Sequence, residues 1–294
     1  MNKITFVTGK GGVGKSALAA SLALSKAQKG LKVLLVELGD QSFYKDFFNL
    51  PKVEYKPTKL QENLDISLWS GPACLEEYAK YLLKIERLYQ LFFENPVMRT
   101  FINIAPALPE LAIVGKITSG HRKVGPPLTY DEIIIDTYAT GHFLALLRAP
   151  KGMAEVVKFG PMGEQTRSIQ KVLFDPEITS IEIVTLPEGL PTTESLELAH
   201  KLESEFNFKP RIWVNKCLTT GLSAQDFKVA STSESPAISK MAEFLQKKSV
   251  KENHARESFS GFKTFELPLV EDVQAWKLIE ELSANCAHIS KSEG

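Results

Sequence analysis

The stretch Gly9-Lys10-Gly11-Gly12-Val13-Gly14-Lys15-Ser16 joins an apolar run, Ile4–Thr8, to a run with helical character, Ala17–Leu24. Glycines let the backbone curl around an anion, and the N-terminus of the following helix adds partial positive charge. At this spacing Lys15 would reach the β- and γ-phosphates, and the Ser16 hydroxyl would bind Mg²⁺. A glycine-rich turn can also serve packing alone, but strand, glycines, Lys-Ser and helix occur here in the order of a phosphate-binding loop. The stretch therefore predicts a site for a di- or triphosphate.

Lys10 is a second lysine in this loop, and a plain phosphate-binding loop does not require it. Neighbouring cations repel unless an anion lies between them, so Lys10 is either a solvated surface lysine or a phosphate ligand. Its placement resembles the deviant Walker A loop of P-loop NTPases, in which this lysine reaches the phosphates of a partner subunit. The resemblance implies a dimer around the nucleotide. The implied nucleotide contacts are Gly11, Gly12, Val13, Gly14, Lys15, Ser16 and Ala17.

The overall charge balance argues against nucleic-acid binding. The chain has 294 residues, with 35 basic and 35 acidic side chains and a formal net charge of zero. Such a chain has no overall field to hold a nucleic-acid backbone. The N-terminus enters the first apolar run at once, and no apolar run approaches the ~20 residues that cross a bilayer. We expect a cytoplasmic protein without stable membrane insertion.

Cysteine and histidine form no metal-binding pattern in the sequence. The cysteines Cys74, Cys217 and Cys286 are far apart, and the five histidines do not cluster with acidic residues at ligand spacing. We expect no structural zinc.

Short apolar runs rich in β-branched residues alternate with longer helix-like segments. This pattern predicts an α/β fold with a doubly wound, mostly parallel sheet flanked by helices. Residues 1–294 are expected to form one domain, with a helical insertion at about 74–120 and a short helical segment at about 151–175. The expected strands are Ile4–Thr8, Val33–Glu37, Leu64–Leu68, Glu132–Asp136, Ser180–Leu186, Pro210–Asn215 and Thr264–Leu267.

Three further segments have distinct patterns. The aromatic and apolar stretches Tyr89–Phe93 and Phe101–Ile104 belong either to the core or to a surface that meets a partner. Thr219–Ser239 is rich in small polar residues and is expected to be a loop. Asp272–Cys286 has apolar residues at three-residue steps, which predicts a C-terminal helix packed on the domain. Acidic residues along that helix argue against a membrane surface.

Asp136 ends the apolar run Glu132–Ile135 and precedes Thr137-Tyr138-Ala139-Thr140-Gly141-His142. A carboxylate at the end of a strand beside a phosphate loop can hold Mg²⁺ and its waters. An Asp-Thr pair can also cap a helix. The residue types alone leave both interpretations open.

Together with the glycine-rich loop, residues 136–142 resemble switch II of the arsenite-pump and tail-anchored-protein-targeting ATPases. The usual form in that family is Asp-Thr-Ala-Pro-Thr-Gly-His, and Tyr138-Ala139 replaces Ala-Pro here. The resemblance continues through Leu144, Leu146, Leu147 and Pro150, then Val184–Glu188, Thr193, Glu194 and Val214–Lys216, and so covers most of the chain. It implies binding of ATP or ADP with Mg²⁺ held by Ser16 and Asp136.

The resemblance also assigns the base-binding residues. It implies that Asn215, at the end of a late strand next to Lys216, reads the adenine ring, and that Pro268 belongs to an apolar wall beside the base. An asparagine amide can donate and accept at once, as adenine recognition requires, whereas a buried structural asparagine would bond to backbone groups.

The main departure from the family lies in switch I. The usual Asp-Pro-Ala-His-Ser is replaced by Glu37-Leu38-Gly39-Asp40-Gln41-Ser42. Either Glu37 or Asp40 would have to orient the attacking water, and misplacement of that water costs on the order of a hundredfold in rate. Ala17 is a second departure, since a threonine often follows the Mg²⁺-binding hydroxyl residue. Nucleotide binding is therefore expected even where hydrolysis is slow.

The expected function is an ATP-binding, slowly hydrolysing dimeric switch in which Lys10 and Lys15 serve catalysis and which acts on a protein partner. One alternative is a hydrolysis-deficient subunit of a heteromeric complex, for which the altered switch I argues. Another is a partition or septum-positioning ATPase, which predicts stimulation by DNA or lipid that no basic patch in the sequence supports. With five methionines and no paired cysteines, a Met-rich client groove and a zinc-clamped dimer are not expected.

Overall fold

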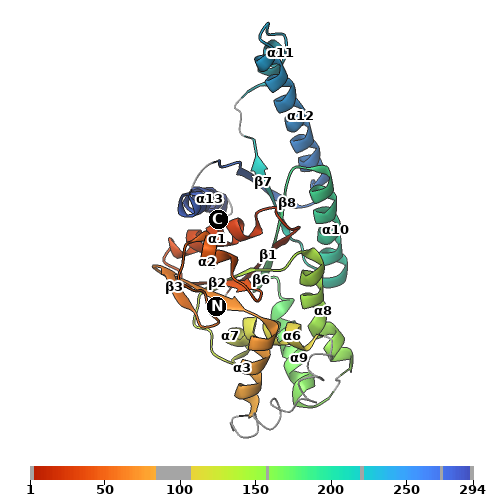
Figure 1. Ribbon diagram of the computed structural model, residues 1–294. Helices are drawn as coiled ribbons and strands as arrows, with labels where there is room; N and C mark the ends of the chain where they lie inside the picture. Colours follow the sequence, from red (N-terminus) through yellow and green to blue (C-terminus); the bar gives the residue numbers. More distant parts are fainter. Residues whose placement is uncertain (1–2, 84–106, 157–158, 219–221, 272–273, 292–294) are drawn as a thin grey trace.

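The computed structural model describes residues 3–83, 107–156, 159–218, 222–271 and 274–291 (Figure 1). Within these residues, eight strands form one sheet in the order β3-β4-β2-β5-β1-β6-β7-β8. All neighbouring strands are parallel except β3 and β4. The predicted α/β class and mostly parallel sheet are thus confirmed. The bounds are Lys3–Gly9 (β1), Val33–Leu38 (β2), Thr58–Gln61 (β3), Leu64–Trp69 (β4), Glu132–Asp136 (β5), Thr179–Thr185 (β6), Arg211–Cys217 (β7) and Lys263–Pro268 (β8).

The central strands lie between two apolar cores. Alternate side chains of β1, β2 and β5 enter opposite cores, because successive residues of a strand point to opposite faces. Ile4, Leu34 and Ile133 join one core, and Val7, Leu35 and Ile134 join the other. Seven strands coincide with the apolar runs noted in the sequence; β3 does not, because it is a polar edge strand that is exposed or half-buried.

Helices cover both faces of the sheet (Figure 1). One core includes side chains from α6, α8, α9 and α10, and the other includes side chains from α1, α2 and α13. The helices span Lys15–Ala27 (α1), Phe43–Phe47 (α2), Gly71–Leu83 (α3), Leu108–Ile117 (α6), Ser119–Arg122 (α7), Thr140–Val156 (α8), Gly160–Leu173 (α9), Gly189–Phe206 (α10), Ala224–Ser231 (α11), Pro236–Ser258 (α12) and Ala275–Lys291 (α13).

The stretch expected as a helical insertion at about 74–120 contains most of α3, all of α6 and the first half of α7, and α3 packs on α6. The segment expected at about 151–175 contains the end of α8 and all of α9. The aromatic stretches Tyr89–Phe93 and Phe101–Ile104 lie outside the described residues.

The predicted loop over Thr219–Ser239 is wrong over much of the described part, because α11 lies within it and α12 begins at Pro236. The Ser223 hydroxyl accepts from the Asp226 N–H at 3.2 Å, and the Asp226 carboxylate accepts from the Ser223 N–H at 2.7 Å. This reciprocal cap starts a helix. The small polar residues therefore cap helices here instead of forming one long loop.

The C-terminal helix predicted over Asp272–Cys286 is confirmed as α13, which packs on α1. Ile279, Leu282 and Cys286 are buried, and the Trp276 ring lies 4.4 Å from the Phe48 ring. Among the described helices, none is both long and apolar enough to cross a membrane.

Candidate nucleotide-binding site

The glycine-rich loop leaves the carboxyl end of β1 and enters α1, at the edge of the sheet where α/β proteins bind ligands. Gly14 is the N-cap of α1 with φ 99°, so no side chain caps the first N–H groups of the helix. A Cβ at Gly14 would lie 2.2 Å from the Asn215 amide nitrogen, and no atom lies within 4 Å of a Cβ placed at Gly11 or Gly12. The loop therefore has the open, glycine-lined shape that a phosphate chain requires.

Lys15 lies over this loop and is held close to it. Its Nζ donates to the Lys10 carbonyl at 3.1 Å. Burial lowers the pKa of Lys15, and the nearby Asp136 carboxylate works in the opposite direction. The structure thus brings Lys15 and Asp136 together, as the sequence predicted.

Asp136 is a buried acid at the phosphate loop. It is 6 % exposed, and its Oδ1 atom has no hydrogen-bond partner among the described residues. The carboxylate interacts with the side chains of Ser16 and Tyr44. Burial raises the pKa of Asp136 to about 6, and Ser16, Lys15 and Tyr44 oppose the rise. An unsatisfied carboxylate oxygen beside a serine hydroxyl suits a hard cation, so these residues fit Mg²⁺.

A site of this kind differs from an all-protein metal cage. In the part of the chain that the structure describes, no three His, Cys, Asp or Glu side chains gather as a metal-binding group. Mg²⁺ at Asp136 and Ser16 would therefore need phosphate oxygens and waters to complete its coordination.

Tyr44 is a site residue that the sequence did not reveal. It is fully buried on α2, and its hydroxyl donates to the Ser16 carbonyl at 2.8 Å and interacts with the Asp136 carboxylate. Burial, with the nearby carboxylates, holds the pKa of Tyr44 well above its usual range. The aromatic run Phe43–Phe48 resembles ordinary core sequence, so only the fold places Tyr44 at the site. It ties α2 to the phosphate loop.

Of the two switch I candidates, Glu37 is buried and Asp40 is exposed. The Glu37 carboxylate accepts from the Ser42 hydroxyl at 2.5 Å and from the Phe43 N–H at 2.6 Å. Burial raises the pKa of Glu37 and these hydrogen bonds oppose the rise. Glu37 therefore holds the start of α2, while Asp40 lies close enough to Tyr138 to affect its pKa.

Lys10 is paired within its own chain. Its Nζ lies 2.8 Å from a carboxylate oxygen of Glu194 on α10, and about a third of each side chain is exposed. Contact with another subunit's phosphates would require this ion pair to open.

Asn215 lies against the phosphate loop. Its amide donates to the Val13 carbonyl and accepts from the Lys216 N–H, both at 2.9 Å, and the residue is 5 % exposed. This is the bonding expected of a structural asparagine, although one amide hydrogen and one oxygen lone pair remain for a base. Lys216 is exposed with φ 59°, and Pro268 is half-buried at the end of β8.

The fold and the site define a P-loop nucleotide-binding protein of the α/β class. A sequence profile of the ArsA ATPase family, described as anion-transporting ATPase, matches residues 2–162. ATPase BagA of Mycobacterium tuberculosis is 30 % identical over 251 residues, which is 83 % of this chain and 73 % of that protein.

Two arsenical pump-driving relatives are longer than this chain. The putative arsenical pump-driving ATPase of Halobacterium salinarum is 29 % identical over 226 residues, which is 71 % of this chain and 34 % of that protein. The arsenical pump-driving ATPase of Escherichia coli is 27 % identical over 207 residues, which is 68 % of this chain and 32 % of that protein. The chain belongs to the ArsA family of ATPases, as the resemblance in its loops predicted.

Proposed function

We propose that this ATPase is a Mg²⁺-dependent nucleotide switch that dimerises around ATP, hydrolyses it slowly and acts on a protein partner. The observation that carries the proposal is the buried, unsatisfied Asp136 carboxylate between Ser16 and Lys15 at the phosphate loop. A buried carboxylate without full hydrogen bonding is costly unless a ligand uses it.

Different residues of the chain would bind the phosphates and the metal ion. Lys15 and the loop N–H groups would bind the β- and γ-phosphates, while Ser16 and Asp136 would hold Mg²⁺. When bound, the metal neutralises charge that develops on the transferred phosphate. Tyr44 would hold Asp136 and the Ser16 backbone at a fixed position relative to α2.

The arrangement of switch I supports slow turnover. The Glu37 carboxylate is committed to the Ser42 hydroxyl and the Phe43 N–H, and Asp40 is exposed. Glu37 is therefore not free to orient a water, and Asp40 would have to do so from an exposed position, so hydrolysis would be slow even where nucleotide binds well. This observation also supports the second candidate function, a subunit that binds nucleotide and leaves hydrolysis to a paralogue.

Dimerisation around nucleotide would use Lys10. In one chain Glu194 neutralises Lys10. The γ-phosphate of a partner subunit would offer a stronger anion, and Lys10 would exchange Glu194 for it. Nucleotide would thereby favour the dimer over the separate chains.

A continuous path from switch I to the helical layer supports action on a protein partner. The Gly39 N–H donates to the Trp69 carbonyl at 3.0 Å, and Lys116 of α6 lies 4.6 Å above the Trp69 ring. Lys116 is buried and pairs with Glu77 of α3 at 2.5 Å. Movement of switch I would therefore bear on α3 and α6, where a partner could respond.

The test is steady-state phosphate release with calorimetric binding of ATP, for wild type and for Lys15→Ala. We expect binding and slow, Mg²⁺-dependent release, with both lost in Lys15→Ala. Tight binding without release would favour the hydrolysis-deficient subunit. Absence of binding, or release unchanged in Lys15→Ala, would contradict both functions.

A further inference from the structure

The two helices α11 and α12 form a hairpin that extends beyond the sheet at one end of the molecule (Figure 1). Phe227 and Ala242 are buried within it. Large apolar side chains of α12 are more than half exposed, with Phe244 at 59 %, Met241 at 57 % and Ile238 at 51 %. Exposed apolar side chains that lie together on a surface mark an interaction site.

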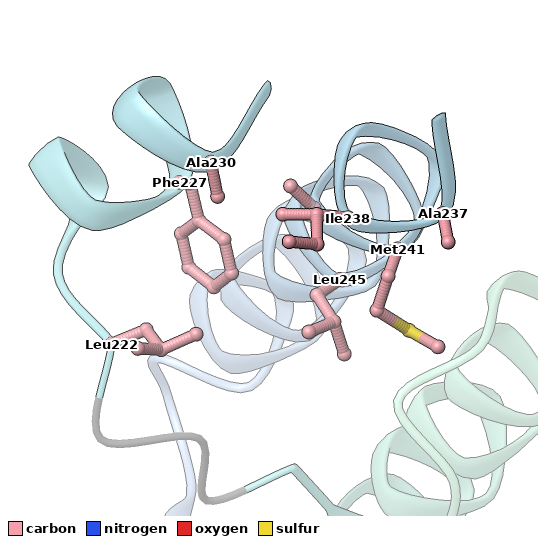
Figure 2. Close-up of a pocket in the computed structure, with 8 residues that line it drawn as sticks. Leu222, Phe227, Ala230, Ala237, Ile238, Met241 and Leu245 are labelled. Atoms are coloured by element: carbon pink, nitrogen blue, oxygen red, sulfur yellow. The ribbon is translucent and has the colours of Figure 1, made fainter. Parts of the chain in front are cut away.

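An apolar groove of about 340 Å³ lies between the two helices. Figure 2 shows Phe227 and Leu222 on the α11 side, and Ile238, Met241 and Leu245 on the α12 side. The side chains that line it are all apolar, so water in the groove has no polar partner among them. Such a surface is stabilised when an apolar phase covers it.

Positive charge lies along the same stretch of α12. Residues 240–251 contain four lysines and one acid, although the whole chain is neutral. Lys240, Phe244, Lys247, Lys248 and Lys251 are spaced i, i+4, i+7, i+8 and i+11, which places them on one face of the helix. Met241 flanks this face, three residues before Phe244. We name these six residues the lysine face.

Within the described residues, the four lysines of this face form no ion pairs, although Glu243 lies on the same helix. By contrast, Lys10, Lys26 and Lys116 each pair with a glutamate. The lysine face therefore carries unneutralised charge that suits an anionic partner.

A nucleic acid would satisfy the lysines but would leave Phe244, Met241 and the groove in water. A bilayer with anionic headgroups satisfies both, because lysines bind the headgroups while apolar side chains enter the interfacial layer. The hairpin tip, Ser231–Pro236, is polar and contains Glu234, so docking would occur along the side of α12. We propose that the lysine face docks this ATPase on an anionic lipid surface.

The experiment is co-sedimentation of the full chain with vesicles of phosphatidylcholine, alone or mixed with phosphatidylglycerol. We expect binding to the mixed vesicles and little to phosphatidylcholine alone. The triple variant Lys240→Glu, Lys247→Glu, Lys251→Glu should bind at least about tenfold more weakly. The control variant Lys56→Glu, Lys59→Glu, Lys171→Glu makes the same charge change at exposed lysines elsewhere and should bind like wild type.

A second variant tests whether the apolar part of the lysine face enters the lipid, without changing any charge. Phe244→Trp replaces an exposed aromatic by another, and its fluorescence should be quenched by brominated lipid in the mixed vesicles more than that of wild type. Three outcomes would overturn the proposal: equal binding to both vesicle types, equal loss in the control variant, or lysine-dependent binding of duplex DNA without binding of the mixed vesicles.

Discussion

The buried surroundings of Asp136 favour its protonated form over the carboxylate. Burial raises its pKa from 3.8 to about 6, so the folded, metal-free chain binds its proton more tightly than the unfolded chain does. Ionised Asp136 therefore lowers the free energy of unfolding. This destabilisation is fully present above the folded pKa, shrinks as the pH falls through about 6, and vanishes below 3.8. The site therefore weakens the metal-free fold at neutral pH and favours Mg²⁺ binding.

Asp136→Asn should stabilise the metal-free protein while removing Mg²⁺ binding. A shift of about two pKa units corresponds to at most about 3 kcal/mol. In EDTA the variant should have the higher melting temperature above pH 6, and the melting temperatures of variant and wild type should converge as the pH falls towards 3.8. A destabilised variant across that range would contradict this account of Asp136.

Tyr44→Phe removes the hydroxyl that holds Ser16 and Asp136. We expect a loss of about 1 kcal/mol in stability. We also expect weaker binding of Mn²⁺ with ADP, followed by electron paramagnetic resonance. Tyr130→Phe is the matched control, because the Tyr130 hydroxyl donates to Asp65 at 2.8 Å away from the site. If the two variants retain equal metal affinity, Tyr44 is only a packing residue.

The phosphate loop and Asp136 could be predicted from the sequence because their chemistry depends on adjacent residues at fixed spacing. The partners of Glu37, Lys10 and Tyr44 could not be. Tyr44 meets Ser16 only when α2 folds back over α1, and Lys10 meets Glu194 across most of the chain. These two contacts join residues that are far apart in the sequence, so no local pattern predicts them.

At the scale of elements, the buried strands could be predicted from the sequence, whereas the exposed elements β3 and α11 could not. The central strands are marked by β-branched runs because helices cover both of their faces. The edge strand β3 is largely polar, and α11 is a short helix whose start depends on one capping pair. Polar composition alone favours a loop in both places.

The capping pair gives an element-scale prediction. Ser223→Ala should destabilise α11 by about 1 kcal/mol, whereas Ser223→Asp should retain the cap because aspartate is an equally good N-cap. Hydrogen exchange of the α11 amides is the measurement, and ATP binding should stay unchanged. Equal exchange in Ser223→Ala and wild type would show that tertiary packing, not the cap, sets α11.

At the scale of the whole molecule, the proposed dimer would require the Lys10–Glu194 ion pair to open in each chain. Glu194→Gln should free Lys10, so that dimers form at lower protein concentration with a non-hydrolysable ATP analogue. A part-exposed ion pair contributes up to about 1 kcal/mol, so the dimerisation constant should change by up to about fivefold for each Lys10 that exchanges its partner. Analytical ultracentrifugation would measure it. Weaker dimerisation would mean that Glu194 supports the dimer.

The dimeric switch is tested most directly by phosphate release per chain as a function of protein concentration, for wild type and Lys10→Ala. Wild-type activity per chain should rise with concentration to a plateau as dimers form, whereas Lys10→Ala should bind ATP and stay at the low basal rate. Activity independent of concentration, or Lys10→Ala hydrolysing at the wild-type rate, would contradict catalysis across a dimer.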